Sequence, residues 1–326
     1  MQRLKKVILT HPLPDDWIIS IRDRCEIIIG PDNCMGVDPA LESQFKDAEG
    51  LIALLSDKID ERILNLAPSL KVVCNMAAGT DNIDLKTCTS RKIPVGFTPG
   101  ILTNATADLA IGLMLAVNRQ LMISATAAKN GEWKMWHPDK WLGMELEGTT
   151  LGIIGMGKIG SAVTKRAFSF GMNIIYVSRS QKTEIENAIS ARKVELKELF
   201  EQSDIISLHA PLNPETYHMV NQDAFRRMKS SAMLINTARG GEVDTGALYQ
   251  ALSTGQIKAA GLDVTDPEPL PPDHPLYSLP NCVILPHIGS ATERTRKKMA
   301  EMTCENLMAG LYGDKLPYCV NPEIYR

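Results

Sequence analysis

Three side chains with complementary acid–base chemistry each follow an apolar, strand-like stretch of the sequence. They are Arg239 after AMLIN, Glu268 after AAGLDV and His287 at the end of CVILPH. A guanidinium can hold a carboxylate with two hydrogen bonds. An imidazolium can give a proton to an alkoxide, and a nearby carboxylate keeps the ring protonated. Together they suit hydride addition to a 2-oxo acid. Singly, each is also explained as a surface arginine, a capping glutamate or a core histidine.

A glycine-rich stretch predicts a site for the hydride donor. In LGIIGMGKIG the spacing G-x-G-x-x-G follows the apolar run at 151–154 and precedes a helix-capable segment. Glycines permit a tight turn and close approach to a pyrophosphate, and the helix N-terminus offers unpaired N–H groups. A further strand at 173–177 completes the order expected of a dinucleotide site, which is favoured over a simple glycine turn. The residues expected at the pyrophosphate are Gly155, Gly157, Lys158, Ile159 and Gly160.

The strand at 173–177 runs into YVSRSQK, which contains no carboxylate. In a dinucleotide fold an Asp or Glu at this place usually binds the ribose hydroxyls. Here Arg179 offers a planar donor fork to a 2′-phosphate, and Ser178 and Ser180 add hydroxyl donors. The sequence therefore favours NADP(H). The alternative is that Arg179 points into solvent and that NAD binds without the acid.

The elements that must position these residues are strands alternating with helices, which is typical of parallel α/β sheets. Four apolar runs, KKVILT, CEIIIG, GLIALLS and LKVVCNMAAG, lie in the first part of the chain. Six more follow: LGIIGMG, NIIYVSR, DIISLHA, AMLINTA, AAGLDVT and CVILPHI. We therefore expect an α/β protein with two doubly wound parallel sheets.

Two long helix-capable segments, at 103–133 and 290–313, lie at the junctions between the two groups of strands. The final KLPYCVNPEIYR is expected to return to the first domain. We therefore expect a discontinuous substrate-binding domain, residues 1–100 plus 290–326, and an inserted nucleotide-binding domain, residues 101–289.

The composition favours a small-molecule partner. The 35 basic residues are balanced by 38 acidic ones, so no global basic field would attract nucleic acid or an anionic membrane. No uninterrupted apolar run approaches the ~20 residues of a membrane helix. The seven cysteines are scattered without a C-x-x-C pair, which is typical of reduced thiols and gives no sign of a metal site. We expect a cytoplasmic protein.

The sequence resembles the D-isomer-specific 2-hydroxyacid dehydrogenase family over essentially its whole length. The matching motifs are AAGTDNID, TNATADLA, LGIIGMGKIG, LHAPLNPET, INTARGGEVD, AAGLDV, EPLPPDHPL and LPHIGSAT. Within the family, LLSDKID, NGEWKMWHPDKWLG and the acid-free YVSRSQK are similar to glyoxylate/hydroxypyruvate reductases. The resemblance implies a flavodoxin-like substrate domain and a Rossmann cofactor domain, with the active site in the interdomain cleft, and usually a homodimer.

The resemblance also implies roles for individual residues. Arg239 would bind substrate, Glu268 would support the histidine, and His287 would be the acid/base. Asp263 would hold the nicotinamide carboxamide, with the backbone of Thr237 and Ala238 nearby.

Other roles that the resemblance implies lie outside these motifs. The amides of Ala78 and Gly79 would receive the substrate carboxylate, and Leu55 and Ser56 would line the pocket. The remaining implied contacts are Thr106 at the nicotinamide, His209 and Pro211 at the adenosine, and Trp141 at the partner's substrate pocket. Thr106 is also explained as a helix-start hydroxyl, His209 as a strand-end histidine, and Trp141 as packing.

The expected activity is NADPH-dependent reduction of glyoxylate to glycolate or of hydroxypyruvate to D-glycerate, with NAD as the alternative cofactor. Another activity of the family remains an alternative: phosphite, formate, 3-phosphoglycerate or D-lactate dehydrogenase. A second alternative is a non-enzymatic, nucleotide-sensing protein like the corepressors that share this fold.

Overall fold

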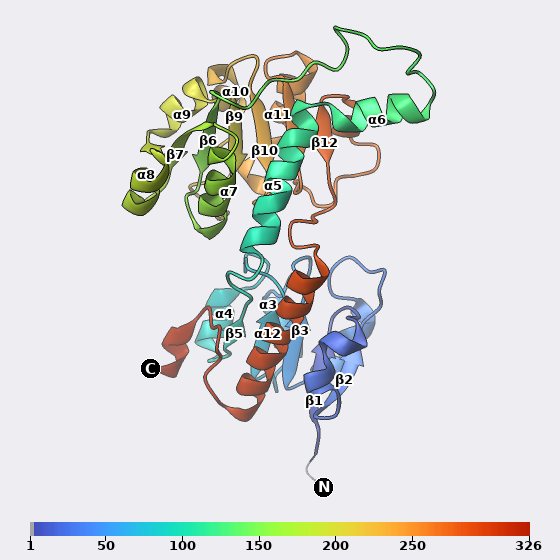
Figure 1. Ribbon diagram of the computed structural model, residues 1–326. Helices are drawn as coiled ribbons and strands as arrows, with labels where there is room; N and C mark the ends of the chain where they lie inside the picture. The colour runs from blue at the N-terminus through green and yellow to red at the C-terminus, as the bar shows by residue number, and fades with distance from the viewer. Residues whose placement is uncertain (1–2) are drawn as a thin grey trace. The chain divides into compact units, whose positions relative to one another are not determined.

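The computed structural model describes residues 3–326, which form two compact α/β units. One unit comprises the chain up to Leu102 together with Ala291–Arg326, and the other runs without interruption from Thr103 to Ser290. Each unit has one parallel sheet with helices packed against it (Figure 1). The α/β class with two parallel sheets, predicted from the alternating apolar runs, is confirmed.

The first unit contains a five-stranded sheet in the order β2-β1-β3-β4-β5. Its strands are β1 (Lys5–Leu9), β2 (Cys25–Ile29), β3 (Gly50–Ala53), β4 (Val72–Asn75) and β5 (Val95–Gly96). β3 and β4 are buried along their whole length, which explains their continuous apolar runs. The first four strands match the four runs seen in the sequence. β5 has two residues and is too short to produce such a run.

Helices of the first unit cover this sheet. They are η1 (Asp15–Trp17), α1 (Ile19–Arg22), η2 (Pro39–Leu41), α2 (Glu42–Phe45), α3 (Glu61–Leu66), α4 (Leu85–Ser90), α12 (Glu293–Tyr312) and η5 (Pro322–Tyr325). α12 starts three residues later than the first residue of the predicted helix, because the hydroxyl of Thr292 caps its N-terminus. The C-terminal tail returns to the sheet, since the N–H of Val320 donates to the carbonyl of Val95 at 2.8 Å.

The second unit contains a seven-stranded sheet in the order β12-β11-β10-β9-β6-β7-β8. The strands are β6 (Thr150–Ile154), β7 (Asn173–Val177), β8 (Arg192–Lys193), β9 (Ile205–Leu208), β10 (Met233–Asn236), β11 (Ala259–Leu262) and β12 (Cys282–Ile284). All six predicted strands are present, and the two-residue β8 is additional. The strand order reverses between β6 and β9, so this is the switch point at which parallel α/β sheets bind ligands.

The helices of the second unit lie on both faces of this sheet. They are α5 (Thr103–Asn118), α6 (Leu121–Lys129), α7 (Lys158–Phe168), α8 (Thr183–Ile189), α9 (Leu196–Gln202), α10 (Gln222–Arg227), η3 (Gly240–Glu242), α11 (Thr245–Ser253) and η4 (Pro275–Ser278). The helical segment predicted at 103–133 is two helices, because Gln120 adopts a left-handed conformation with φ 50° and the axes bend by 61°. Figure 1 shows α6 and the loop that follows it extending away from α5.

Within residues 3–326, no single helix is long and apolar enough to cross a membrane. α5 and α6 reach the required length and composition only when taken together across their bend.

Candidate active site

The carboxyl ends of five neighbouring strands bring the candidate residues of the second unit to one edge of its sheet. In spatial order, His287 follows β12, Asp263 follows β11, Arg239 follows β10, His209 follows β9 and Gly155 follows β6. All of these strands are parallel, so the residues after them emerge on the same side. The catalytic candidates therefore lie at the same edge as the predicted dinucleotide turn.

His287 and Glu268 form a close pair at this edge. The Nδ1 atom of His287 lies 2.5 Å from Oε1 of Glu268, and both side chains are partly exposed. A carboxylate only accepts hydrogen bonds, so Nδ1 carries a hydrogen and donates it. When the ring is protonated, Nε2 carries a second hydrogen for transfer. His287 also has a left-handed backbone with φ 52°, which is uncommon outside glycine.

Asp263 holds the backbone of the loop that carries His287. Its carboxylate is 1% exposed and accepts from the N–H of Ile288 at 2.7 Å and of Gly289 at 2.8 Å. Burial raises the pKa of Asp263, while these two amides and His287 act against that rise. The hydroxyl of Thr106 donates to the carbonyl of Gly289 at 3.2 Å, so it supports the same loop. Both residues thus have a positioning contact within the protein, beside the cofactor roles expected from the resemblance.

The turn that presents Arg239 is held by Asn236, a residue that the sequence analysis missed. The amide of Asn236 donates to the carbonyl of Arg239 at 2.8 Å and accepts from the N–H of Ala238 at 2.9 Å. An asparagine at the end of a strand, bonding to the backbone two residues on, is a recognisable turn signal. Gly240 follows, and a Cβ there would lie 1.9 Å from the carbonyl oxygen of Thr265, so only glycine fits.

Glu242 is a second feature that the sequence analysis missed. Its side chain is completely buried, and among residues 3–326 neither carboxyl oxygen has a hydrogen-bond partner. Burial raises the pKa of Glu242 to about 8, although the charge of Arg239 acts in the opposite direction. An acidic residue between a turn and a helix is normally taken for a surface residue, so its burial leaves no signal in the sequence.

The glycines after β6 meet the steric needs of a dinucleotide turn. Gly155 has φ 98°, and a Cβ there would lie 2.5 Å from the backbone of His209 and Ala210. A Cβ at Gly160 would lie 2.1 Å from the carbonyl oxygen of Gly155, whereas a Cβ at Gly157 would meet no atom within 4 Å. α7 begins at Lys158, with Gly157 as its N-cap. Its first N–H groups, including those of Lys158 and Ile159, are available to a phosphate.

Two buried polar atoms at this edge of the sheet have no partner within the described part of the chain. They are Nδ1 of His209 and the hydroxyl of Thr237. The other ring nitrogen of His209 lies 2.8 Å from the hydroxyl of Ser207, and burial lowers the pKa of His209 to about 3, so the ring is neutral. Unsatisfied donors and acceptors beside a glycine cradle fit a polar ligand such as a nicotinamide dinucleotide.

The loop after β7 leaves Arg179 exposed. Within residues 3–326 its guanidinium makes no hydrogen bond or ion pair, and Ser178 and Ser180 stand beside it. The end of the loop is fixed, because the hydroxyl of Tyr176 accepts from the N–H of Lys182 and donates to Glu186, both at 2.8 Å. Glu186 of the following helix α8 is thus engaged, since it also accepts from the side-chain amide of Gln181 at 2.8 Å. Pro211, the candidate on the adenosine side, is exposed after β9.

The substrate candidates of the first unit lie after two neighbouring strands of its own sheet. Leu55 and Ser56 are exposed in the turn after β3, and Ala78 and Gly79 are half-buried in the loop after β4. They therefore share one edge of that sheet.

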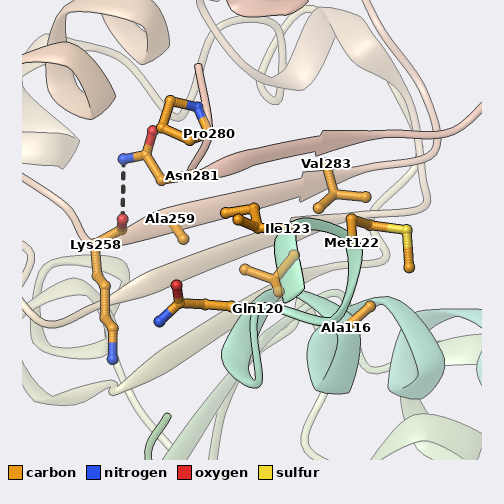
Figure 2. Close-up of a pocket in the computed structure, with 10 residues that line it drawn as sticks. Ala116, Gln120, Met122, Ile123, Lys258, Ala259, Pro280, Asn281 and Val283 are labelled. Carbon is orange, nitrogen blue, oxygen red and sulfur yellow. Dashed lines mark hydrogen bonds between the residues drawn. The ribbon is translucent and has the colours of Figure 1, made fainter. Parts of the chain in front are cut away.

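The segment around Trp141 carries much exposed apolar surface. Trp141 itself is half-buried with φ 55°, and Lys140 lies over its ring at 5.7 Å. Exposed apolar side chains between positions 121 and 142 are Leu121, Met122, Trp133, Met135, Trp136 and Leu142. A cavity of about 250 Å³ lies beside this segment, between α5 and α6 and the edge of the sheet at β11 and β12 (Figure 2).

Among residues 3–326, no group of three or more His, Cys, Asp or Glu side chains is arranged to hold a metal ion.

Comparison with known proteins relates the chain to one family. Residues 111–289 match the family described as D-isomer specific 2-hydroxyacid dehydrogenase, NAD binding domain. The chain is 45% identical over 323 residues to the glyoxylate reductase of Thermococcus litoralis, which covers 98% of this chain and 97% of that protein. The TT0316 protein from Thermus thermophilus has a similar structure, with a TM-score of 0.90, 45% identity, and coverage of 97% of this chain and 99% of that chain.

Two more distant solved structures hold cofactors. The NADPH-dependent glyoxylate/hydroxypyruvate reductase from Sinorhizobium meliloti, solved with NADP and malonate, is 29% identical with a TM-score of 0.86 and covers 98% of each chain. The D-lactate dehydrogenase from Aquifex aeolicus, complexed with NAD and lactic acid, is 28% identical with a TM-score of 0.87. It covers 97% of this chain and 99% of that chain.

Proposed function

Since the chain belongs to the D-isomer specific 2-hydroxyacid dehydrogenase family, we propose that it reduces small 2-oxo acids: glyoxylate to glycolate, and hydroxypyruvate to D-glycerate. The observation that carries this proposal is the pairing of His287 with Glu268 at the same sheet edge as the glycine turn. Similarity to glyoxylate reductases over almost the whole chain supports the choice of substrate.

In the proposed reaction, reduced nicotinamide supplies a hydride to the carbonyl carbon when the cofactor is bound. His287 gives the proton from Nε2 to the carbonyl oxygen, and Glu268 stabilises the imidazolium through Nδ1. Arg239 holds the substrate carboxylate and polarises the carbonyl. The further substrate contacts that we propose are the amides of Ala78 and Gly79 for the carboxylate, and Leu55 and Ser56 for the lining of the pocket.

The proposed cofactor is NADPH. Arg179 supports this choice because it is exposed, is unengaged within the described residues and lies in YVSRSQK, which contains no acid. The proposed contacts of the nicotinamide are Asp263 and Thr106, with the backbone of Thr237 and Ala238 nearby. His209 and Pro211 are the proposed contacts of the adenosine.

We also propose a homodimer formed through the segment at 121–142. Six large apolar side chains are exposed there, more than isolated surface residues would explain. The neighbouring cavity adds apolar surface from Val117, Met122, Ile123 and Val283, and its rim is fixed by Asn281, whose amide donates to the carbonyl of Lys258 at 3.0 Å. Met122→Glu combined with Trp136→Glu is expected to turn a dimer into a monomer in light scattering. A wild-type protein that is already monomeric would contradict the proposal.

A substrate panel tests the activity. Initial rates are measured with NADPH and NADH for glyoxylate and hydroxypyruvate, and in the oxidative direction for D-lactate, phosphite, formate and 3-phosphoglycerate. We expect the highest kcat/KM for glyoxylate or hydroxypyruvate. A higher value for another compound would reassign the substrate, and no turnover with tight nucleotide binding would favour a nucleotide-sensing protein.

A further inference from the structure

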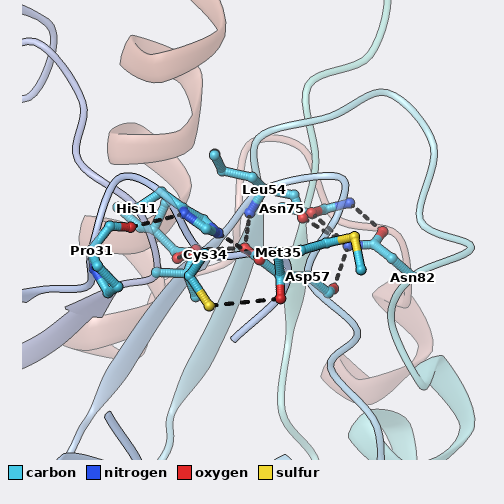
Figure 3. Close-up of polar contacts among 10 residues, drawn as sticks. His11, Pro31, Cys34, Met35, Leu54, Asp57, Asn75 and Asn82 are labelled. Atoms are coloured by element: carbon cyan, nitrogen blue, oxygen red, sulfur yellow. Dashed lines mark hydrogen bonds and ion pairs between the residues drawn. The ribbon is translucent and has the colours of Figure 1, made fainter. Parts of the chain in front are cut away.

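A buried carboxylate lies directly beneath the turn that carries Leu55 and Ser56. Asp57 is 0% exposed, and its side chain accepts from the hydroxyl of Thr10 at 2.5 Å and from the N–H of Leu54 at 2.7 Å. The Nε2 atom of His11 lies 2.9 Å from its other oxygen. Thr10 and His11 follow β1, so Asp57 joins the ends of two neighbouring strands (Figure 3).

The second ring nitrogen of His11 also faces an oxygen atom. Its Nδ1 lies 3.2 Å from the carbonyl oxygen of Pro31, so both ring nitrogens face oxygen acceptors. A neutral imidazole has one N–H, whereas an imidazolium donates to both. His11 is 7% exposed, so the pair is an ion pair within the protein when the ring is charged.

The same network continues into the loop that carries Ala78 and Gly79. The side-chain amide of Asn82 donates to the carbonyl of Leu54 at 3.0 Å and to the carbonyl of Asp57 at 2.9 Å. The amide of Asn75, which is fully buried, donates to Asn82 at 2.9 Å and to the carbonyl of Gly79 at 2.9 Å. One continuous set of hydrogen bonds therefore connects the turn after β3 with the loop after β4.

We propose that Asp57, Asn82, Asn75 and His11 are positioning residues that fix the turn at 54–57 and the loop at 77–82 in one arrangement, and thereby set the affinity for the carboxylate of the 2-oxo acid. A buried ion pair is weak evidence for stability, because desolvation offsets much of its attraction. Here the contacts of Asp57 act by holding the backbone in position, since every donor to Asp57 comes from a strand end or a turn. The inference rests on the proposed function, because it assigns those two loops to substrate.

Substrate kinetics test the inference. Asp57→Asn keeps the shape of the side chain but removes its charge, and Asn82→Ala removes the link between the loops. Each variant is expected to raise KM for glyoxylate by about tenfold or more, equivalent to about 1.4 kcal/mol of binding. The kcat is expected to stay within about threefold and the Kd for NADPH unchanged, since the cofactor candidates lie in the other unit.

Two control variants show whether the loss of any polar contact in this unit has the same effect. Asp47→Asn breaks the pair with Lys6, at the opposite end of β1, and Asn321→Ala removes a buried amide bonded to Ile93 and Val95. Both are expected to leave KM near the wild-type value. Equal increases of KM in the control and test variants would overturn the positioning role.

Hydrogen exchange separates this inference from the proposed activity. Asn82→Ala is expected to increase amide exchange at both 54–57 and 77–82, and this readout does not require turnover. Asn321→Ala is expected to increase exchange at neither segment. A change confined to one of the two loops would overturn the coupling. Absent glyoxylate turnover in the wild type, with both loops responding, would instead contradict the substrate and leave the network established.

Discussion

The Nδ1 atom of His287 and the Oε1 atom of Glu268 lie 2.5 Å apart, although 19 positions separate the two residues in the sequence. This contact directs one ring nitrogen to the carboxylate, so the other is the one that can serve a reacting oxygen. The backbone of His287 is held separately, because its N–H donates to the carbonyl of Asp263 at 3.0 Å. The ring of His287, the proposed proton donor, is thus oriented by Glu268, and its backbone is held by the residue that follows β11.

The first prediction concerns this pair. His287→Ala is expected to lower kcat for glyoxylate by about 10² or more, since general acid catalysis contributes about 10²- to 10⁴-fold. Glu268→Gln should give a smaller loss, because the amide oxygen still accepts from Nδ1 but its charge is gone. The Kd for NADPH, measured by fluorescence titration, should stay unchanged in both.

His274 provides the matched control. It lies in the same segment between β11 and β12 as Glu268, and its ring accepts from the N–H of Leu276 at 3.3 Å. His274→Ala should retain nearly full kcat. A kcat for His287→Ala close to that of the control would exclude His287 as the proton donor.

The second prediction concerns cofactor choice. Arg179→Asp replaces a hydrogen-bond donor to the 2′-phosphate with a hydrogen-bond acceptor for the ribose hydroxyls. The ratio of kcat/KM for NADPH over NADH should therefore fall by at least about tenfold. The exposed Arg226→Asp on α10 serves as a control for the charge change alone. An unchanged ratio in Arg179→Asp would mean that the 2′-phosphate is bound elsewhere.

The third prediction concerns pH and stability. In the folded protein the pKa of Glu242 is about 8 against an ordinary 4.5, so between these values the folded state keeps a proton that the unfolded chain has lost. The free energy of unfolding therefore falls as pH rises through this range. Glu242→Gln removes this dependence. Its Tm should exceed that of the wild type more at pH 8 than at pH 5, and a constant difference would contradict the burial of an uncompensated carboxyl.

Much of the fold follows from the sequence because strands buried on both faces leave continuous apolar runs, as in β3, β4, β9 and β10. The ends of those runs also give the positions of Arg239 and His287. β5 and β8 leave no run, since each has two residues. The bend at Gln120 cannot be predicted from the sequence either, because the helix-forming composition continues through it.

The parts of the site that the sequence does not reveal are those that depend on tertiary partners. Asn236, Asp57 and Asn82 are ordinary polar residues until the structure shows which backbone groups they hold. Glu242 is similar: nothing in its neighbours in the chain predicts complete burial. Polar residues with distant partners have no periodic pattern, and a single sequence does not connect positions such as His11 and Asp57.

The fourth prediction concerns two glycines with opposite expected effects. A Cβ at Gly240 would overlap the carbonyl of Thr265, so Gly240→Ala should lower stability by about 1–3 kcal/mol or more. Gly112, within α5, has no atom within 4 Å of such a Cβ. Gly112→Ala should therefore raise stability by about 0.5–1 kcal/mol through helix propensity. Thermal unfolding of both variants checks this, and a stabilised Gly240→Ala would show that the turn beside Arg239 is not closely packed.

The proposed activity is measured as the oxidation of NADPH in the presence of glyoxylate, followed at the absorbance band of the reduced nicotinamide, with the product identified. We expect rapid oxidation that depends on glyoxylate, formation of glycolate in equal amount, and loss of the rate in His287→Ala. Binding of NADPH without any glyoxylate-dependent oxidation by the wild type would contradict it.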